Sequence, residues 1–195
     1  MPAIKDLIQV GRAEDYLRCT DIVDFDSPAV AAVAASVAGA SGADTLRAAF
    51  ELVRDRFPHT LRSCSGGVAC SASDVLRMGH GLCYAKSHLL AALLRHHRIP
   101  AGFCYQRFIE DDGPILHGLV AAFVDGRWVR LDPREGTAFD PGGDMLAFRT
   151  DESRGERDYL FVFPRPDAGV VRVLRSAKDA GSLAKMLPQD LSCPS

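Results

Sequence analysis

The stretch HGLCYAKSHLLAALL, residues 80–94, decides the fold that this sequence predicts. Plotted at 100° per residue, its apolar side chains cover about 200° of the helix circumference, which is wider than the apolar face of a surface helix. We therefore expect a central, largely buried helix that begins near Cys83. Ile99-Pro100 ends this helix, because the residue before a proline avoids helical geometry.

A β-hairpin is expected after this helix, in the sequence LHGLVAAFVDGRWVRLDP, residues 116–133. Asp125-Gly126 is the preferred pair for a two-residue type I′ turn, and such a turn fixes which residues of the two strands face each other. Counting outward from the turn, Leu119 faces Asp132. Because side chains alternate between the two faces of a sheet, His117 and Asp132 become diagonal neighbours on one face. A slip of one residue would send them to opposite faces.

The remaining pattern predicts helices first and strands later. Expected helices run from Ser27-Pro28 to about Gly39, from a cap at Asp44 to before Pro58, and from Ser73-Asp74 to Gly79, with a short helix over Ala3–Leu17. Expected strands are Phe103–Ile109, Leu116–Val124 and Trp128–Leu131, with Tyr159–Phe163 and Val170–Leu174 as two further candidates and an extended piece at residues 22–25. Residues 149–158 read as a mobile loop. This order favours an α+β domain with a mainly antiparallel sheet.

Length and composition set the broad class. A chain of 195 residues fits a single compact domain, with a core over about residues 27–175 and peripheral segments at 1–26 and 188–195. The net charge of −2 gives no reason to expect nucleic acid or a membrane surface as a partner. No apolar run is long enough to span a bilayer, and residues 1–10 lack the pattern of a signal peptide. We therefore expect a cytoplasmic protein.

The cysteines predict free thiols. Six of them stand at the irregular positions 19, 64, 70, 83, 104 and 193, which does not suggest a disulfide framework. Cys64, Cys70, His80 and Cys83 have side chains that can bind metal. Structural zinc ligands usually occur in pairs about two to four residues apart, however, and Cys64 and Cys70 do not. We expect no metal and no other cofactor.

Two arginines, Arg127 and Arg130, lie on the second strand of the expected hairpin, and a third, Arg134, comes just after it. They could bind an anionic substrate. Charged residues that alternate along a hairpin more often form a solvated face, and that is the expectation here.

The thiol, imidazole and carboxylate predict a nucleophilic site. Cysteine attacks a carbonyl carbon as the thiolate, and a free thiol has a pKa of about 8.5. The site must therefore supply positive charge that lowers this pKa. The N-terminus of a helix provides that charge, together with unpaired N–H groups that can receive an oxyanion. Asp132 could fix the tautomer of His117, whose other ring nitrogen would then take the proton of Cys83.

In these features the sequence resembles the transglutaminase-like superfamily of cysteine enzymes. The matching runs are GLCYAK (81–86), RIPA (98–101), HG (117–118) and DGRWVRLDP (125–133), within about residues 46–133. The runs VRD (53–55) and AGFCYQR (101–107) are similar to small bacterial stand-alone members. The resemblance implies a papain-like α+β fold in which Cys83 is the nucleophile, His117 the general base and acid, and Asp132 the orienting carboxylate.

The sequence also departs from the protein-crosslinking members of that superfamily. Leu82 and Tyr84 stand where those enzymes usually have glutamine and tryptophan, and the only tryptophan, Trp128, does not lie upstream of the cysteine. Hydrolysis or transfer on a smaller acyl substrate is therefore at least as well supported as crosslinking. Their positions in the matched runs make four residues candidates for contact with the substrate or the oxyanion: His59, Tyr84, Tyr105 and Gln106.

The sequence thus predicts an enzyme that attacks an amide through a thioester on cysteine and passes the acyl group to water or an amine. Its substrate would be a peptide, a protein or a small amide. Two alternatives stay open. One is a Cys-His-Asp acyltransferase that uses a thioester donor such as a coenzyme A ester, and the other is a catalytically silent module that holds a peptide in the cleft. The oligomeric state is left open as well.

Overall fold

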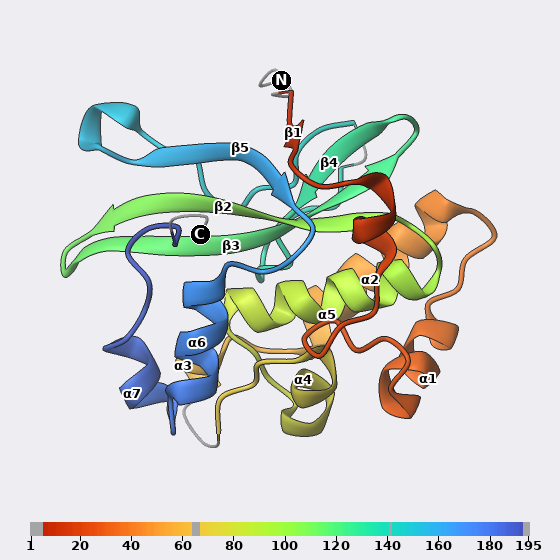
Figure 1. Ribbon diagram of the computed structural model, residues 1–195, viewed down its shortest axis with the longest axis horizontal. Helices are drawn as coiled ribbons and strands as arrows, with labels where there is room; N and C mark the ends of the chain where they lie inside the picture. The colour runs from red at the N-terminus through yellow and green to blue at the C-terminus, as the bar shows by residue number, and fades with distance from the viewer. Residues whose placement is uncertain (1–5, 64–66, 141, 193–195) are drawn as a thin grey trace.

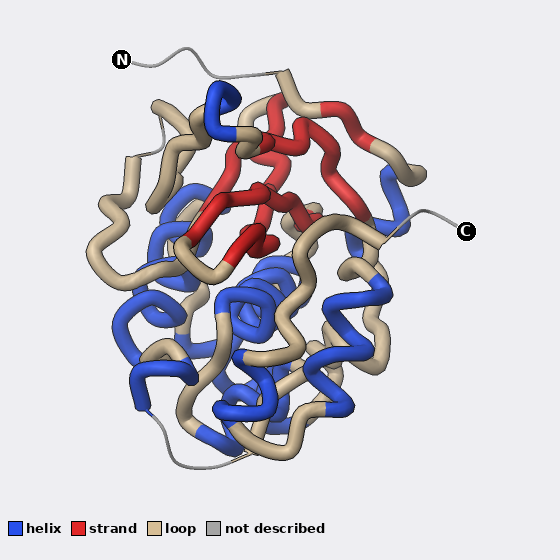
Figure 2. The backbone as a smooth tube through the Cα atoms, turned by 90° about the vertical axis from the view of Figure 1, so that its left-hand side faces the viewer, coloured by secondary structure: helices blue, strands red, loops and turns tan. Residues whose placement is uncertain are grey.

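The computed structural model describes residues 6–63, 67–140 and 142–192. Its α-helices and its sheet form two layers, with the α-helices gathered on one side of the strands (Figure 1; Figure 2). The helical elements in chain order are η1 (Ala13–Leu17), α1 (Pro28–Ser36), α2 (Gly42–Arg56), α3 (Thr60–Ser63), α4 (Ala72–Met78), α5 (Cys83–His96), η2 (Glu152–Arg154), α6 (Ala168–Ser176) and α7 (Ala180–Ala184). The strands are β1 (Ile8–Gln9), β2 (Ala101–Glu110), β3 (Gly113–Val124), β4 (Arg127–Leu131) and β5 (Arg157–Phe163).

The five strands form one sheet in the order β1-β5-β2-β3-β4. β1 runs parallel to β5, and every other neighbouring pair is antiparallel. The expected α+β class with a mainly antiparallel sheet is therefore confirmed. β2 and β3 are its longest strands, and every residue of β2 pairs with a residue of β3.

α5 is the central helix, as its wide apolar face predicts. All of its residues from Tyr84 to Arg95 are buried. It packs against β3 on one side and is surrounded by α1, α2 and α4 on the others, which Figure 1 shows below the sheet. The first and last residues of this helix, Cys83 and His96, are half-buried.

The hairpin register follows the count from the turn. Asp125 and Gly126 have φ angles of 51° and 78°, as a type I′ turn requires at both central positions. The β3–β4 ladder runs from the pair Val124 and Arg127 to the pair Val120 and Leu131. Beyond it the chain leaves β3, because the N–H of Asp132 bonds instead to the carbonyl of Met145 at 2.8 Å.

Three expectations about regular structure are wrong. Val170–Leu174 lies in helix α6 and not in a strand. Asp167 caps this helix by accepting hydrogen bonds from the N–H groups of Gly169 and Val170. The two buried residues, Val170 and Leu174, are four positions apart and so share a helix face. The run of β-branched residues suggested a strand, but packing of one face decided the outcome.

The expected helix over Ala3–Leu17 is also wrong within the described residues, which begin at 6. Strand β1 and the short η1 occupy this region, because Ile8 and Gln9 pair with Phe161 and Val162 of β5. Residues 22–25 form bends and turns and no strand.

The remaining differences lie at element ends. α1 ends at Ser36, and α2 and α4 begin earlier than expected because Ser41 and Ser71 are their caps. Residues 149–158 contain η2 and the start of β5. In the described part of the chain no helix combines the length and the apolar character that crossing a membrane requires.

Candidate active site

Cys83 is held at the start of α5 by a short connection from α4. Gly79 ends α4 in the left-handed conformation, with φ of 75°. Gly81 then bridges to the segment before α3, since its N–H bonds to the carbonyl of Pro58 and its own carbonyl accepts from the N–H of Thr60, both at 3.2 Å. No side chain caps α5, so its first N–H groups stay available beside the thiol.

His117 and Asp132 form a buried hydrogen-bonded pair. Nε2 of His117 lies 2.8 Å from Oδ2 of Asp132, and both side chains are almost fully buried. The two groups meet as expected, although the pairing of Leu119 with Asp132 counted from the turn is not formed, because the β3–β4 ladder ends at Val120 and Leu131. With Nε2 engaged by the carboxylate, Nδ1 is the ring nitrogen left for Cys83.

His117 lies on β3 where that strand pairs with β2 only, opposite Gln106. β4 ends opposite Val120, so β3 has no β4 partner at His117. Gly118, the next residue, lets the first turn of α5 approach, since an added Cβ would lie 2.5 Å from Cδ1 of Tyr84. The Tyr84 hydroxyl donates to the carbonyl of Leu116 and fixes this contact.

The electrostatics favour a charged thiol and imidazole. Burial raises the pKa of the Cys83 thiol, but the positive charge and hydrogen bonding of His117, followed by those of His59, outweigh burial and lower this pKa well below its ordinary value. Burial lowers the pKa of His117, whereas the charges of Asp132 and Cys83 and their hydrogen bonds raise it by more. A thiolate facing an imidazolium is the state that these shifts favour.

Residues 144–148, a segment that carries no recognisable motif, complete this arrangement. The segment runs beside the end of β4, where the N–H of Met145 bonds to the carbonyl of Arg130 at 2.9 Å. Two residues on, the N–H of Ala147 lies 3.3 Å from Oδ2 of Asp132. The ring of Phe148 then stands edge-on to His117 with 5.4 Å between ring centroids. The segment thus contacts both members of the pair.

Arg130 anchors the segment, which corrects the expected solvated face. Its side chain is buried and donates from Nε and Nη2 to Oδ2 of Asp144, at 3.0 and 2.8 Å. Nη1 lies 2.5 Å from Oδ1 of Asp158. A buried guanidinium between two carboxylates is well compensated, and here it links β4 to the loop at Asp144 and to strand β5 at Asp158.

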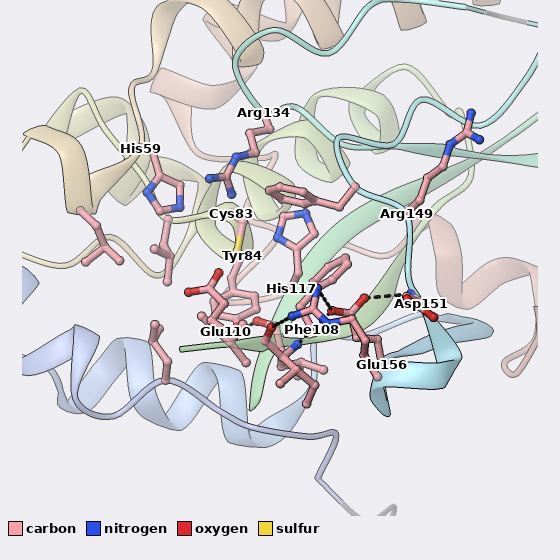
Figure 3. Close-up of a pocket in the computed structure, with 18 residues that line it drawn as sticks. His59, Cys83, Tyr84, Phe108, Glu110, His117, Arg134, Arg149, Asp151 and Glu156 are labelled. Carbon is pink, nitrogen blue, oxygen red and sulfur yellow. Dashed lines mark hydrogen bonds and ion pairs between the residues drawn. The ribbon is translucent and has the colours of Figure 1, made fainter. Parts of the chain in front are cut away.

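Two cavities adjoin the thiol (Figure 3). The larger, of about 510 Å³, has apolar walls that include Phe108, Ile115 and Phe148, and both Cys83 and His117 line it. The smaller, of about 210 Å³, is lined by charged residues, among them Lys86 and Asp132. Cys83, His59 and Arg134 line both cavities. The thiol therefore lies where the two spaces meet.

The four contact candidates separate into two pairs. His59 and Tyr84 line the larger cavity, and Figure 3 shows the His59 ring on the opposite side of the Cys83 sulfur from His117. Tyr105 and Gln106 do not line it. The hydroxyl of Tyr105 accepts from the N–H of Asp167 at 2.7 Å, and the Gln106 amide donates to Asp158 at 3.4 Å. Both side chains therefore form hydrogen bonds outside the larger cavity.

Metal-binding residues do not converge in the described part of the chain. No three side chains of His, Cys, Asp or Glu type lie close enough to hold an ion together. Cys64, one of the four residues that were considered as ligands, lies outside the described residues.

Comparison with known proteins gives a family and a fold. The family model for the transglutaminase-like superfamily matches residues 31–133. A solved structure from Cytophaga hutchinsonii, a candidate cysteine protease, superposes with a TM-score of 0.52 at 22% identity, over 66% of this chain and 46% of that one. This likeness shows a shared fold, and the chain spans about half the length of that relative.

Two further solved structures match less closely. A candidate protease from Parabacteroides distasonis gives a TM-score of 0.41 at 14% identity, over 56% of this chain and 25% of that one. A transglutaminase gives 0.40 at 13% identity, over 72% and 42%. No curated protein matches the sequence.

Proposed function

The chain belongs to the transglutaminase-like superfamily, and we propose that it is a cysteine-dependent enzyme that transfers or hydrolyses the acyl group of an amide. In this proposal Cys83 is the nucleophile, His117 is the general base and acid, and Asp132 orients the imidazole. The substrate is a peptide, a protein or a small amide, and the chemistry needs no cofactor.

The first step is the attack of the Cys83 thiolate on the carbonyl carbon. The lowered pKa of the thiol supports this role, because it keeps the sulfur ionised near neutral pH. The carbon–sulfur bond forms, and the carbonyl oxygen becomes an oxyanion. The N–H groups at the start of α5, which no side chain caps, are placed to donate to that oxyanion.

The second step needs an acid at the leaving nitrogen. Protonated His117 supplies the proton, so the amine departs and the acyl group stays on sulfur as a thioester. Neutral His117 then takes a proton from the incoming water or amine, and Cys83 leaves again as thiolate. Asp132 holds the ring through both steps by its 2.8 Å contact with Nε2.

One observation carries the proposal: the thiol at the mouth of a buried helix faces an imidazole whose far nitrogen is held by a buried carboxylate. A module that only binds a peptide does not require a half-buried thiol with a lowered pKa. The same geometry would also serve a thioester donor, so the acyl donor itself must be found by experiment.

Acylation of Cys83 tests the proposal without a known substrate. We expect 4-nitrophenyl acetate to release 4-nitrophenolate and to leave an acetyl group on Cys83, located by mass spectrometry after digestion. Cys83→Ala abolishes both signals, and His117→Ala lowers the rate by about a hundredfold or more. Cys19→Ala is the matched control, because Cys19 is also half-buried but has a raised pKa, and this variant keeps the full rate.

The proposal is wrong if Cys83→Ala acylates at the rate of the unaltered protein while its circular dichroism is unchanged. Acylation of several cysteines at equal rates would also count against it. In the successful case, a peptide library screened for products that depend on Cys83 identifies the amide.

A further inference from the structure

Three of the six charged residues that line the larger cavity, Asp151, Arg154 and Glu156, have hydrogen-bond or ion-pair partners near one another. The carboxylate of Glu156 accepts from the N–H groups of Asp151 at 2.8 Å and Ile109 at 3.4 Å. Arg154 donates to the carbonyl of Ile109 at 3.1 Å and lies 3.7 Å from Glu156. Asp151 accepts from the N–H of Ser153 at 2.9 Å. These groups have partners within the protein.

Arg134 differs from them in its surroundings. Its guanidinium carbon lies 4.6 Å from the centroid of the Phe148 ring, and the side chain is half-buried. Within residues 6–63, 67–140 and 142–192, no carboxylate forms an ion pair with it. A guanidinium stacked on a ring keeps its N–H donors directed outward around the ring edge, so Arg134 has donors to offer to a ligand.

Its position places those donors at the reacting thiol. Arg134 lines both cavities, as Cys83 does, and in Figure 3 its guanidinium points toward the Cys83 sulfur. The two other charged residues that line the larger cavity, Glu110 and Arg149, are exposed. Figure 3 shows the Arg149 side chain directed away from Cys83. Arg134 is thus the cation that a ligand meets next to the thiol.

We propose that Arg134 binds a carboxylate on the acyl part of the substrate, so that the enzyme prefers acidic acyl groups. This inference rests on the proposed function, since it names the substrate class of the same site. Arginine pairs with a carboxylate through two parallel N–H···O bonds, which fixes orientation as well as adding binding energy. The apolar wall of Phe108, Ile115 and Phe148 accommodates the methylene groups between that carboxylate and the carbonyl.

Two reagent pairs that differ only in one charge test this inference. The first pair is iodoacetate and iodoacetamide, which alkylate Cys83 without any acyl chemistry. The second is the 4-nitrophenyl half-ester of glutarate and its methyl ester. In the second pair the thiolate forms a bond to the ester carbonyl and 4-nitrophenolate leaves. The ratio of rates, acidic reagent over neutral, is measured for each pair at Cys83.

The variants are Arg134→Met, which keeps an apolar stem against Phe148, and Arg149→Met as the matched control from the rim of the same cavity. We expect Arg134→Met to lower both ratios by about tenfold to a hundredfold, the usual effect of a hydrogen bond to a charged group. Arg149→Met leaves both ratios unchanged. Equal melting temperatures show that both variants fold.

The inference is overturned if Arg134→Met slows the acidic and the neutral reagents equally, because Arg134 would then act on the oxyanion or on the fold. It is also overturned if both ratios match those of the unaltered protein. The alkylation pair separates these outcomes from a failure of the proposed function. If Cys83 prefers iodoacetate through Arg134 but no ester acylates it, the carboxylate site stands and acyl transfer is wrong.

Discussion

The backbone N–H of Ala147 meets Oδ2 of Asp132 at 3.3 Å, the same oxygen that lies 2.8 Å from Nε2 of His117. A loop residue thereby shares the carboxylate with the imidazole. A carboxylate oxygen that accepts two hydrogen bonds is fixed in orientation. The loop is therefore part of what positions His117.

Removing that N–H tests the role of the loop. Ala147→Pro deletes the donor, and we expect the rate of Cys83 acylation to fall by about tenfold, since one hydrogen bond to a charged group is lost. Ala147→Gly keeps the N–H and serves as the control, with a rate close to that of the unaltered protein. Equal rates for the two variants, at equal melting temperatures, would show that the contact does not matter.

The parts of the site that could be predicted from sequence are those set by local rules. The turn at Asp125-Gly126 fixes its own register, and the count from it places His117 beside Asp132. The apolar pattern of α5 likewise predicts its burial and places Cys83 at its start. The hairpin ladder itself ends at Leu131, so the final position of Asp132 also depends on its backbone bond to Met145.

The parts that could not be predicted depend on contacts distant in sequence. Residues 144–148 form no helix or strand, and their place is set by Arg130, whose burial the hairpin pattern did not indicate. Tyr105 and Gln106 lie within a matched run, yet their partners, Asp167 and Asp158, come from later segments. For α6, the apolar run at 170–174 is too short to separate a helix from a strand by periodicity.

The buried ion pairs of Arg130 predict a large effect on stability. Arg130→Met leaves the carboxylates of Asp144 and Asp158 without their cation, and we expect the free energy of unfolding to fall by about 3–5 kcal/mol. The control is Arg175→Met, which breaks the exposed pair with Asp21 and costs about 1 kcal/mol or less. Urea unfolding measures both. A loss at Arg130 no greater than that at Arg175 would contradict the prediction.

Lys86 predicts a dependence of stability on pH. Burial lowers its pKa to about 8, an effect that the charges of Asp132, Glu135 and Asp55 offset only in part. Below pH 8 the folded protein therefore holds a costly buried charge. Between pH 8 and the unfolded pKa near 10.5, the folded protein releases the proton first and gains stability relative to the unfolded chain.

Lys86→Met removes that titration. Its free energy of unfolding, relative to the unaltered protein, should fall by on the order of 2 kcal/mol as the pH rises from about 7 to 10.5. Urea unfolding at the two pH values measures the change, and the exposed Lys178→Met gives a difference near zero. A constant difference for Lys86→Met across this range would show that Lys86 titrates normally.

Gly118 predicts a steric limit beside the site. A Cβ there would lie 2.5 Å from Cδ1 of Tyr84, so Gly118→Ala must displace the first turn of α5. We expect about 1–3 kcal/mol of lost stability and slower acylation of Cys83. Gly42→Ala is the control, since its Cβ would meet nothing within 4 Å. Unchanged acylation in Gly118→Ala would mean that this close approach does not position the thiol.

The pH dependence of Cys83 alkylation by iodoacetamide tests most directly whether His117 and Cys83 act as one unit. The pKa of Cys83 is lowered to about 6, so the labelling rate should reach half its maximum near that pH and stay high above it. In His117→Ala the midpoint should rise toward the ordinary thiol pKa of about 8.5, and Cys19 serves as the internal reference in both proteins. A midpoint for Cys83 that is already ordinary in the unaltered protein, or that does not move in His117→Ala, would contradict the account.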